Sequence, residues 1–116
     1  MSELIDRVSA AASLTPETAR EAVGNILAFL RSESSDPAVE TMISGTPGAA
    51  DALQAAGDSE FGGGIMALGG KLMGLGLDMG QIRTVGEELI AFSKSHVDEA
   101  TVSTAIASVP ALAPFV

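Results

Sequence analysis

Cysteine, tryptophan and tyrosine are all missing from this sequence, and its aromatic content is limited to four phenylalanines among 116 residues. Without cysteine, the chain has no disulfide bonds and no thiolate chemistry. With so few aromatic rings and so much alanine, the core must be built mainly from aliphatic side chains. Long runs of β-branched residues are also missing, and this composition predicts an all-α fold rather than a sheet.

Basic residues are scarce as well. Six Lys and Arg stand against fifteen Asp and Glu, and the formal net charge is -9 at pH 7. This balance argues against a nucleic-acid partner, because phosphate binding needs basic patches. It also disfavours contact with anionic membrane surfaces, which attract Lys and Arg. The first ten residues, MSELIDRVSA, lack the basic segment and apolar run of a signal peptide, so a cytoplasmic location is expected.

Residues that could carry catalysis are few. His96 is the only histidine, and with Asp98 and Glu99 it makes a poor start for a metal site, because a structural metal needs about four protein ligands. No second histidine or G-x-S-x-G elbow is present to activate a serine. The residues around Gly70 and Lys71 do not complete a phosphate-binding loop. The sequence therefore predicts a chain that is not an enzyme, with no catalytic, cofactor-binding or metal-binding residues.

The feature that stands out is a glycine-rich stretch over residues 62–80, GGGIMALGGKLMGLGLDMG. Apolar residues at helical spacing predict a buried face there, made of Ile65, Leu68, Leu72 and Leu75. Gly70 and Gly74 form a G-x-x-x-G pair, which allows another backbone to approach closely. Because each glycine in a helix costs about 0.5–1 kcal/mol relative to alanine, we expect close neighbours to hold this helix at the centre of the fold.

Two alternatives to a buried central helix remain open for this stretch. The glycines could form a seam between copies of the chain, or the helix could contact a membrane. A membrane-spanning helix needs about 20 apolar residues, and Lys71 and Asp78 interrupt this one, so membrane contact is the less favoured interpretation.

Capping residues predict where the helices begin. Thr15, followed by Pro16, predicts a helix that runs to about Arg31. Its apolar residues at helical spacing predict a buried stripe of Ala19, Ala22, Val23, Ile26, Leu27 and Leu30, whereas Arg20, Glu21, Asn25 and Arg31 are expected to face outward. Asp78 and Gln81 have the spacing of a capping box and predict a second long helix to about Ser95. Shorter helices are predicted near the N-terminus and with starts at Ser35-Asp36-Pro37, at Thr46-Pro47 and at Asp98-Glu99. The apolar tail from Pro110 is expected to dock in the core.

The two halves of the sequence align without a gap at an offset of 63 residues, which places Leu14–Leu53 over Leu77–Val116. Helix starts coincide, with Thr15 over Asp78 and Ser35 over Asp98, and identical pairs include Arg20/Arg83, Phe29/Phe92, Val39/Val102 and Pro47/Pro110. We expect one domain, a compact bundle of two repeats around the glycine-rich helix. Its copies span residues 1–53 and 64–116, joined by a connector over 54–63.

Some residues of the second copy resemble a known group of proteins. The run Gly76–Ile82, the later Phe92 and the closing Val109-Pro110-Ala111-Leu112 with Phe115-Val116 resemble small bacterial helical domains of unknown function near the YidB-like group. In those families a glycine follows the tail proline, where this chain has Ala111. The resemblance covers roughly the last 55 residues. It implies an all-helical fold and no site residues.

These observations favour a non-enzymatic helical module that binds a protein partner or a second copy of itself. The candidate interaction surface comprises Gly69, Gly70, Gly74, Gly86, Met66 and Met73. Gly86 belongs to it because it replaces Val23 of the first copy and would admit a neighbouring backbone. Two alternatives remain: a lipid- or membrane-associating protein, and a carrier whose apolar ligand occupies a cleft lined by Met66, Met73, Met79 and Phe92.

Overall fold

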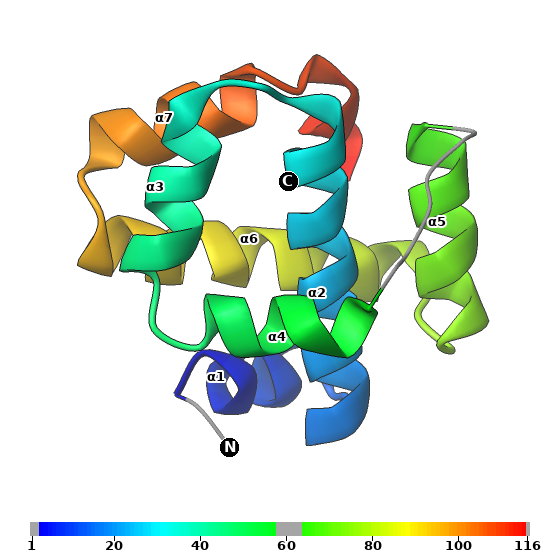
Figure 1. Ribbon diagram of the computed structural model, residues 1–116. Helices are drawn as coiled ribbons and strands as arrows, with labels where there is room; N and C mark the ends of the chain where they lie inside the picture. The colour runs from blue at the N-terminus through cyan, green and yellow to red at the C-terminus, as the bar shows by residue number, and fades with distance from the viewer. Residues whose placement is uncertain (1–2, 58–63, 116) are drawn as a thin grey trace.

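The computed structural model describes residues 3–57 and 64–115, and it confirms the predicted all-α fold. No strand occurs in these ranges. In chain order the described elements are α1 (Glu3–Ala12), α2 (Pro16–Glu33), α3 (Pro37–Gly45), α4 (Ala49–Ala56), α5 (Ile65–Gly74), α6 (Met79–His96), α7 (Glu99–Ala107) and the 3-10 helix η1 (Pro110–Phe115). The long helices α2 and α6 pack against each other and carry the shorter ones around them (Figure 1).

Both long helices begin at the predicted residues. The Thr15 side chain accepts a hydrogen bond from the Thr18 backbone N–H, and Pro16 occupies the first turn of α2. At the start of α6, Asp78 accepts from the Gln81 N–H at 2.8 Å, and the Gln81 side chain accepts from the Asp78 N–H at 3.0 Å. The predicted capping box is therefore present.

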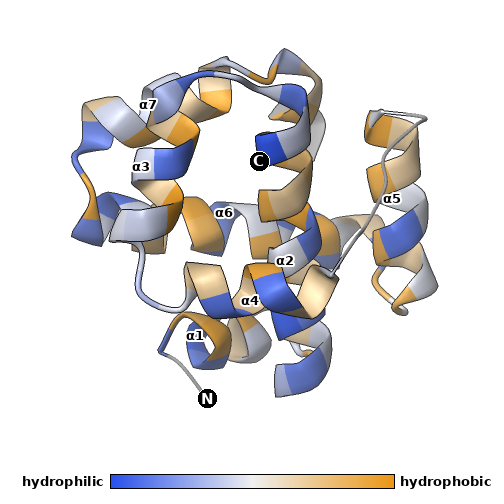
Figure 2. Ribbon diagram, in the orientation of Figure 1, coloured by the Kyte–Doolittle hydropathy of each residue, from blue (hydrophilic) through white to orange (hydrophobic). Residues whose placement is uncertain are grey.

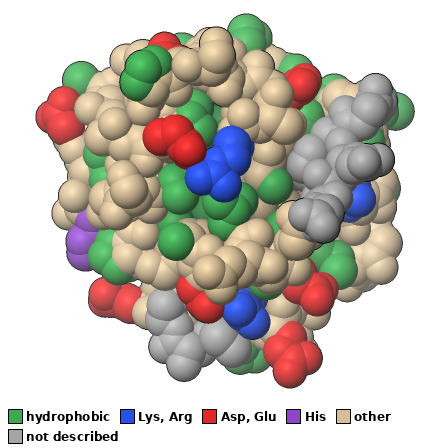
Figure 3. All heavy atoms as spheres, in the orientation of Figure 1, with side chains coloured by type: hydrophobic (Ala, Val, Ile, Leu, Met, Phe, Trp, Pro, Cys, Tyr) green, Lys and Arg blue, Asp and Glu red, His purple; other side chains and the backbone are tan. Residues whose placement is uncertain are grey.

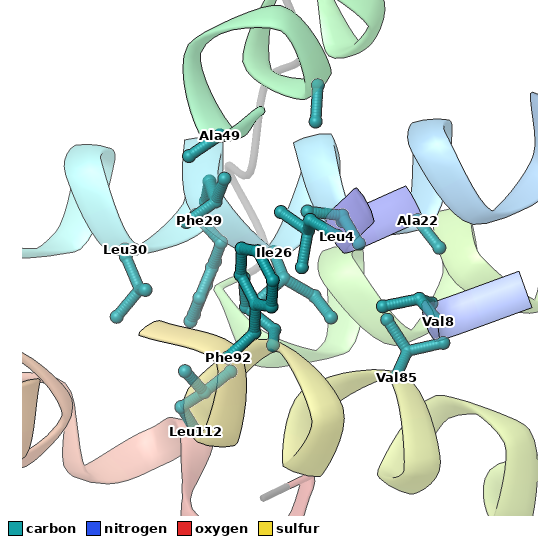
Figure 4. Close-up of a cluster of buried hydrophobic side chains, with 14 of the residues drawn as sticks. Leu4, Val8, Ala22, Ile26, Phe29, Leu30, Ala49, Val85, Phe92 and Leu112 are labelled. Atoms are coloured by element: carbon teal, nitrogen blue, oxygen red, sulfur yellow. The ribbon is translucent and has the colours of Figure 1, made fainter. Parts of the chain in front are cut away.

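The core is aliphatic, as the composition predicts, and it draws on helices from both halves of the chain (Figure 4). Among the described side chains, the buried rings are those of Phe29 of α2 and Phe92 of α6. The predicted stripe of α2 is fully inside, and its buried members include Ala19, Ala22, Val23, Ile26, Leu27 and Leu30. Leu112 of η1 is also fully buried, so the expected docking of the C-terminal segment is confirmed at this residue.

One residue predicted to face outward is inside. Asn25 is only 8% exposed. Its side-chain amide donates a hydrogen bond to the Glu21 carbonyl oxygen at 2.8 Å. A polar side chain can be buried in a helix when it bonds the carbonyl one turn earlier, and helical periodicity alone does not reveal this.

Two of the short helices start one or two residues later than predicted. Asp36 rather than Ser35 is the cap of α3, and its carboxylate accepts from the Ala38 N–H at 2.9 Å. The cap of α4 is Gly48, at φ 88°, rather than Thr46. Thr46 is buried and donates to the Met42 carbonyl oxygen, so it ends α3 instead of starting α4. Since α4 continues to Ala56, the boundary expected at residue 53 does not coincide with a helix end.

The glycine-rich helix does not lie at the centre. In Figure 1, α5 stands at the edge of the bundle, and its main neighbour is α2. Leu68 and Leu72 of the predicted buried face are fully buried. Gly70 and Gly74 are exposed, and a Cβ added to either would meet nothing within 4 Å. Ile65 and Leu75 of the predicted face are only partly buried, although they also pack against the core. The central space is taken by the side chains of α2 and α6, so α5 attaches at the edge through these apolar residues.

Candidate functional site

The exposed large hydrophobic residues among the described ranges are Met66, Met73 and Met79, which are 80%, 51% and 50% exposed. Met66 and Met73 belong to α5, and Met79 is the first residue of α6. Four exposed α5 residues follow helical spacing and form what we call the α5 outer face: Met66, Gly70, Met73 and Gly74. Figure 2 shows α5 as largely hydrophobic or neutral along its length.

The orientation of α5 is set by its C-terminal end. The Leu77 N–H donates to the Leu72 carbonyl oxygen, and the Gly76 N–H donates to that of Met73. Gly76 has φ 98°, which is the left-handed conformation of a Schellman motif. Because the next residue after Leu77 is the cap of α6, this turn sets how α5 leaves the bundle.

The predicted interaction residues therefore divide into two groups. Met66, Met73, Gly70 and Gly74 share the α5 outer face. Gly69 lies on the buried side of the same helix, and Gly86 is buried in α6. The close approach of another backbone at Gly86 stays a prediction. The close helix approach that the sequence placed at Gly70 and Gly74 occurs elsewhere, where Gly24 of α2 meets α4.

Charge is distributed unevenly around this face. No Asp or Glu occurs from Phe61 to Leu77, and Lys71 is the only charged residue there. The four arginines make ion pairs elsewhere: Arg7–Glu88, Arg20–Asp51, Arg31–Glu40 and Arg83–Glu87. The α5 outer face is thus nearly free of charge in a strongly acidic chain.

Several shallow hollows are lined by described residues, and two of them combine apolar and charged side chains in a way that bears on binding. The α2–α4 hollow, of about 410 Å³, is lined by Arg31, Ile43, Ala50, Leu53, Gln54 and Gly57. Figure 3 shows an acidic and a basic side chain together over hydrophobic atoms at the centre of the face that carries α2, α3 and α4. The α6–α7 hollow, of about 310 Å³, is lined by Ile90, Lys94, Val102, Ser103, Ile106 and Ala107.

Neither hollow is the cleft expected from the sequence. That cleft was to be lined by Met66, Met73, Met79 and Phe92. Phe92 is buried in the core, whereas the three methionines lie on the outside, so the prediction is wrong. A signal for the α6–α7 hollow was present in the sequence: at the offset of 63, Lys94 aligns with Arg31, but Ser103 aligns with Glu40.

Within the described ranges, no group of three or more His, Asp and Glu residues could hold a metal ion. His96 is the last residue of α6, and its ring lies 4.6 Å from that of Phe92 between centroids. None of the helices formed by residues 3–57 and 64–115 is long and apolar enough to cross a membrane. The resemblance to the YidB-like group stays a prediction, because the chain matches no protein-family model, no curated protein and no solved structure.

Proposed function

We propose that this protein is a non-enzymatic helical module that self-associates through the α5 outer face. The observation that carries the proposal is the exposure of Met66 and Met73 beside two bare glycines. Methionine is flexible and polarizable, and it is over-used at adaptable binding surfaces. A cluster of exposed large apolar side chains marks an interaction site more often than scattered ones do.

Charge favours a second copy of the chain as the occupant. Two molecules of net charge -9 repel one another over most of their surfaces. The α5 outer face carries no Asp or Glu of its own, so that repulsion is reduced there. Two α5 helices that cross at Gly70 could approach closely, because glycine keeps side chains out of the contact.

We also infer that the chain is an internal duplication, and several features support it. α2 and α6 each span 18 residues and begin 63 positions apart. The packing is reciprocal: α1 packs on α6 while α5 packs on α2, and α4 packs on α2 while η1 packs on α6. α3 and α7 pack on each other. Each copy would thus lend its first helix to the other copy's long helix.

Under this duplication, α1 is the helix of the first copy that corresponds to α5, so the exposed residues of the two helices can be compared. At the offset of 63, Met66, Gly70 and Met73 correspond to Glu3, Arg7 and Ala10, and all of these residues are exposed. On α1, Arg7 pairs with Glu88 at 3.4 Å. The first copy therefore presents charged or small residues where the second presents methionine and glycine. Charged or small residues at this place satisfy the fold, so the methionines point to a separate use.

The size of the face limits the affinity. A helix of ten residues is about 15 Å long, and it cannot bury the roughly 800 Å² per partner of a standard interface. We therefore expect a weak dimer with a Kd of about 0.1 mM.

Sedimentation equilibrium from about 10 µM to about 1 mM, which brackets that Kd, tests the proposal. The average mass should rise from that of the 11.7 kDa monomer. Met73→Lys should keep the chain monomeric, because the two lysines of a dimer would have to be buried together. Ala10→Lys, at the corresponding exposed place on α1, should dimerise like the wild type.

A wild-type chain that stays monomeric over this range would overturn self-association. Ala10→Lys that blocks dimerisation as strongly as Met73→Lys would show that added charge in general, rather than the α5 outer face, is responsible. A monomeric chain that floats with neutral phospholipid vesicles, and no longer does so as Met66→Lys, would replace the proposal with lipid association through the same face.

A further inference from the structure

The α6–α7 hollow combines an apolar wall with one cation and one hydroxyl. Ile90, Val102 and Ile106 supply the wall, and the exposed Lys94 and Ser103 stand at its rim. We propose that this hollow binds a small amphiphilic acid, a carboxylate with a short aliphatic chain. Lys94 and Ser103 would take the carboxylate, and the wall would take the chain.

Lys94 is suited to an anion because it has no ion-pair partner within the ranges that the structure describes. Its counterpart Arg31 is engaged: the guanidinium donates to both carboxylate oxygens of Glu40 at 3.0–3.3 Å. In the second copy, the position that corresponds to Glu40 is occupied by Ser103. This comparison rests on the proposed duplication, whereas the hollow and its lining do not.

The Ser103 hydroxyl makes no hydrogen bond to the described residues, so it can donate to a ligand. The Lys94 ammonium offers three more donors, and bonds from a cation to a carboxylate are among the strongest in proteins. A carboxylate can accept from both groups at once. The pair is therefore chemically matched to an acid rather than to an alcohol or an amine.

The aliphatic part must supply most of the affinity. The chain as a whole repels anions, and Glu99 lies one helical turn before Ser103 on α7. Each methylene that is fully buried is worth about a fourfold gain in binding. The volume of about 310 Å³ is at the small end of ligand pockets, so a chain of about eight carbons is the appropriate probe.

The experiment is a titration of the ¹⁵N-labelled protein with octanoate, acetate or octanol, followed by amide chemical shifts. Octanoate should give saturable shifts confined to the last two turns of α6 and to α7. Acetate lacks the chain and octanol lacks the charge, so each should bind at least about fivefold more weakly. Shifts spread over the whole surface, or equal responses to octanoate and octanol, would overturn the proposal.

Three surface variants complete the test, each checked for an unchanged helical spectrum. Lys94→Gln should weaken octanoate binding about fivefold. Ser103→Glu, which reproduces the acid of the first copy, should abolish it. Glu40→Ser, which frees Arg31, should leave the α6–α7 shifts unchanged and serves as the matched control. Unchanged binding in both Lys94→Gln and Ser103→Glu would remove these two residues from the site and overturn the assignment.

Discussion

Gly24 of α2 lies against the main chain of α4 at Ala52. A Cβ on Gly24 would come within 3.0 Å of the Ala52 carbonyl group and 3.3 Å from the Ala56 Cβ. The two helices touch through backbone at this point, with alanines on the α4 side. Glycine is therefore required here for the approach of two helices rather than for a turn, because its φ is not positive.

Gly24→Ala should destabilise the fold. The added methyl group meets backbone, which cannot rotate away, so α4 must shift as a whole. Overpacking of this kind costs about 1–3 kcal/mol in the free energy of unfolding. Urea denaturation followed by circular dichroism measures the change. Gly24→Ala with wild-type stability would show that α4 moves without cost.

Gly70→Ala should have the opposite effect. Its added Cβ meets nothing within 4 Å, and alanine in an exposed helix position is more favourable than glycine by about 0.5–1 kcal/mol. The free energy of unfolding should rise by that amount at low protein concentration. From the G-x-x-x-G pair alone, replacing both Gly70 and Gly74 with leucine would be expected to prevent folding or association. The open space around both glycines now limits the expected loss to association, which sedimentation equilibrium reports separately.

Asp78→Ala should destabilise the chain by about 1 kcal/mol, because it removes the side-chain half of the capping box of α6. The matched control is Asp98→Ala. Asp98 holds the same place before α7 but makes no side-chain cap bond, so its loss should cost only a few tenths of that value through the helix dipole. Equal losses in the two variants, measured by urea denaturation, would contradict this account.

Thr46 and Ser93 form a buried polar pair between the end of α3 and α6. Their hydroxyl oxygens lie 3.1 Å apart, and neither side chain is appreciably exposed. Thr46→Val should lower the free energy of unfolding by about 1–3 kcal/mol, because it removes the hydrogen-bond partner of the Ser93 hydroxyl and of the Met42 carbonyl oxygen. In the variant that combines Thr46→Val with Ser93→Ala, the loss should be smaller than the sum of the two single losses, since no hydroxyl is left unpaired. Strict additivity in this double-mutant cycle would show that the two residues are not coupled.

Local rules predicted the helices because caps and periodicity act over a few residues. Thr15, Asp78 and the apolar stripe of α2 specify where a helix begins and which side is buried, whatever lies opposite. The same rules placed Asn25 outside, because they do not include its bond to the Glu21 carbonyl oxygen. They also grouped six residues as one interaction surface. Of these, Met66, Met73, Gly70 and Gly74 share an exposed face, whereas Gly69 and Gly86 are buried.

The position of that face was decided only in three dimensions. Gly24 and Gly70 are both helical glycines, and nothing in the neighbouring sequence tells which of them meets another backbone. The difference arises because α4 crosses α2 at Gly24, whereas no described element lies over Gly70. The sequence by itself determined an aliphatic, all-helical chain and most of its helix starts. Tertiary packing, which depends on side chains far apart in the sequence, decided that the glycine-rich helix lies at the edge with its methionines exposed.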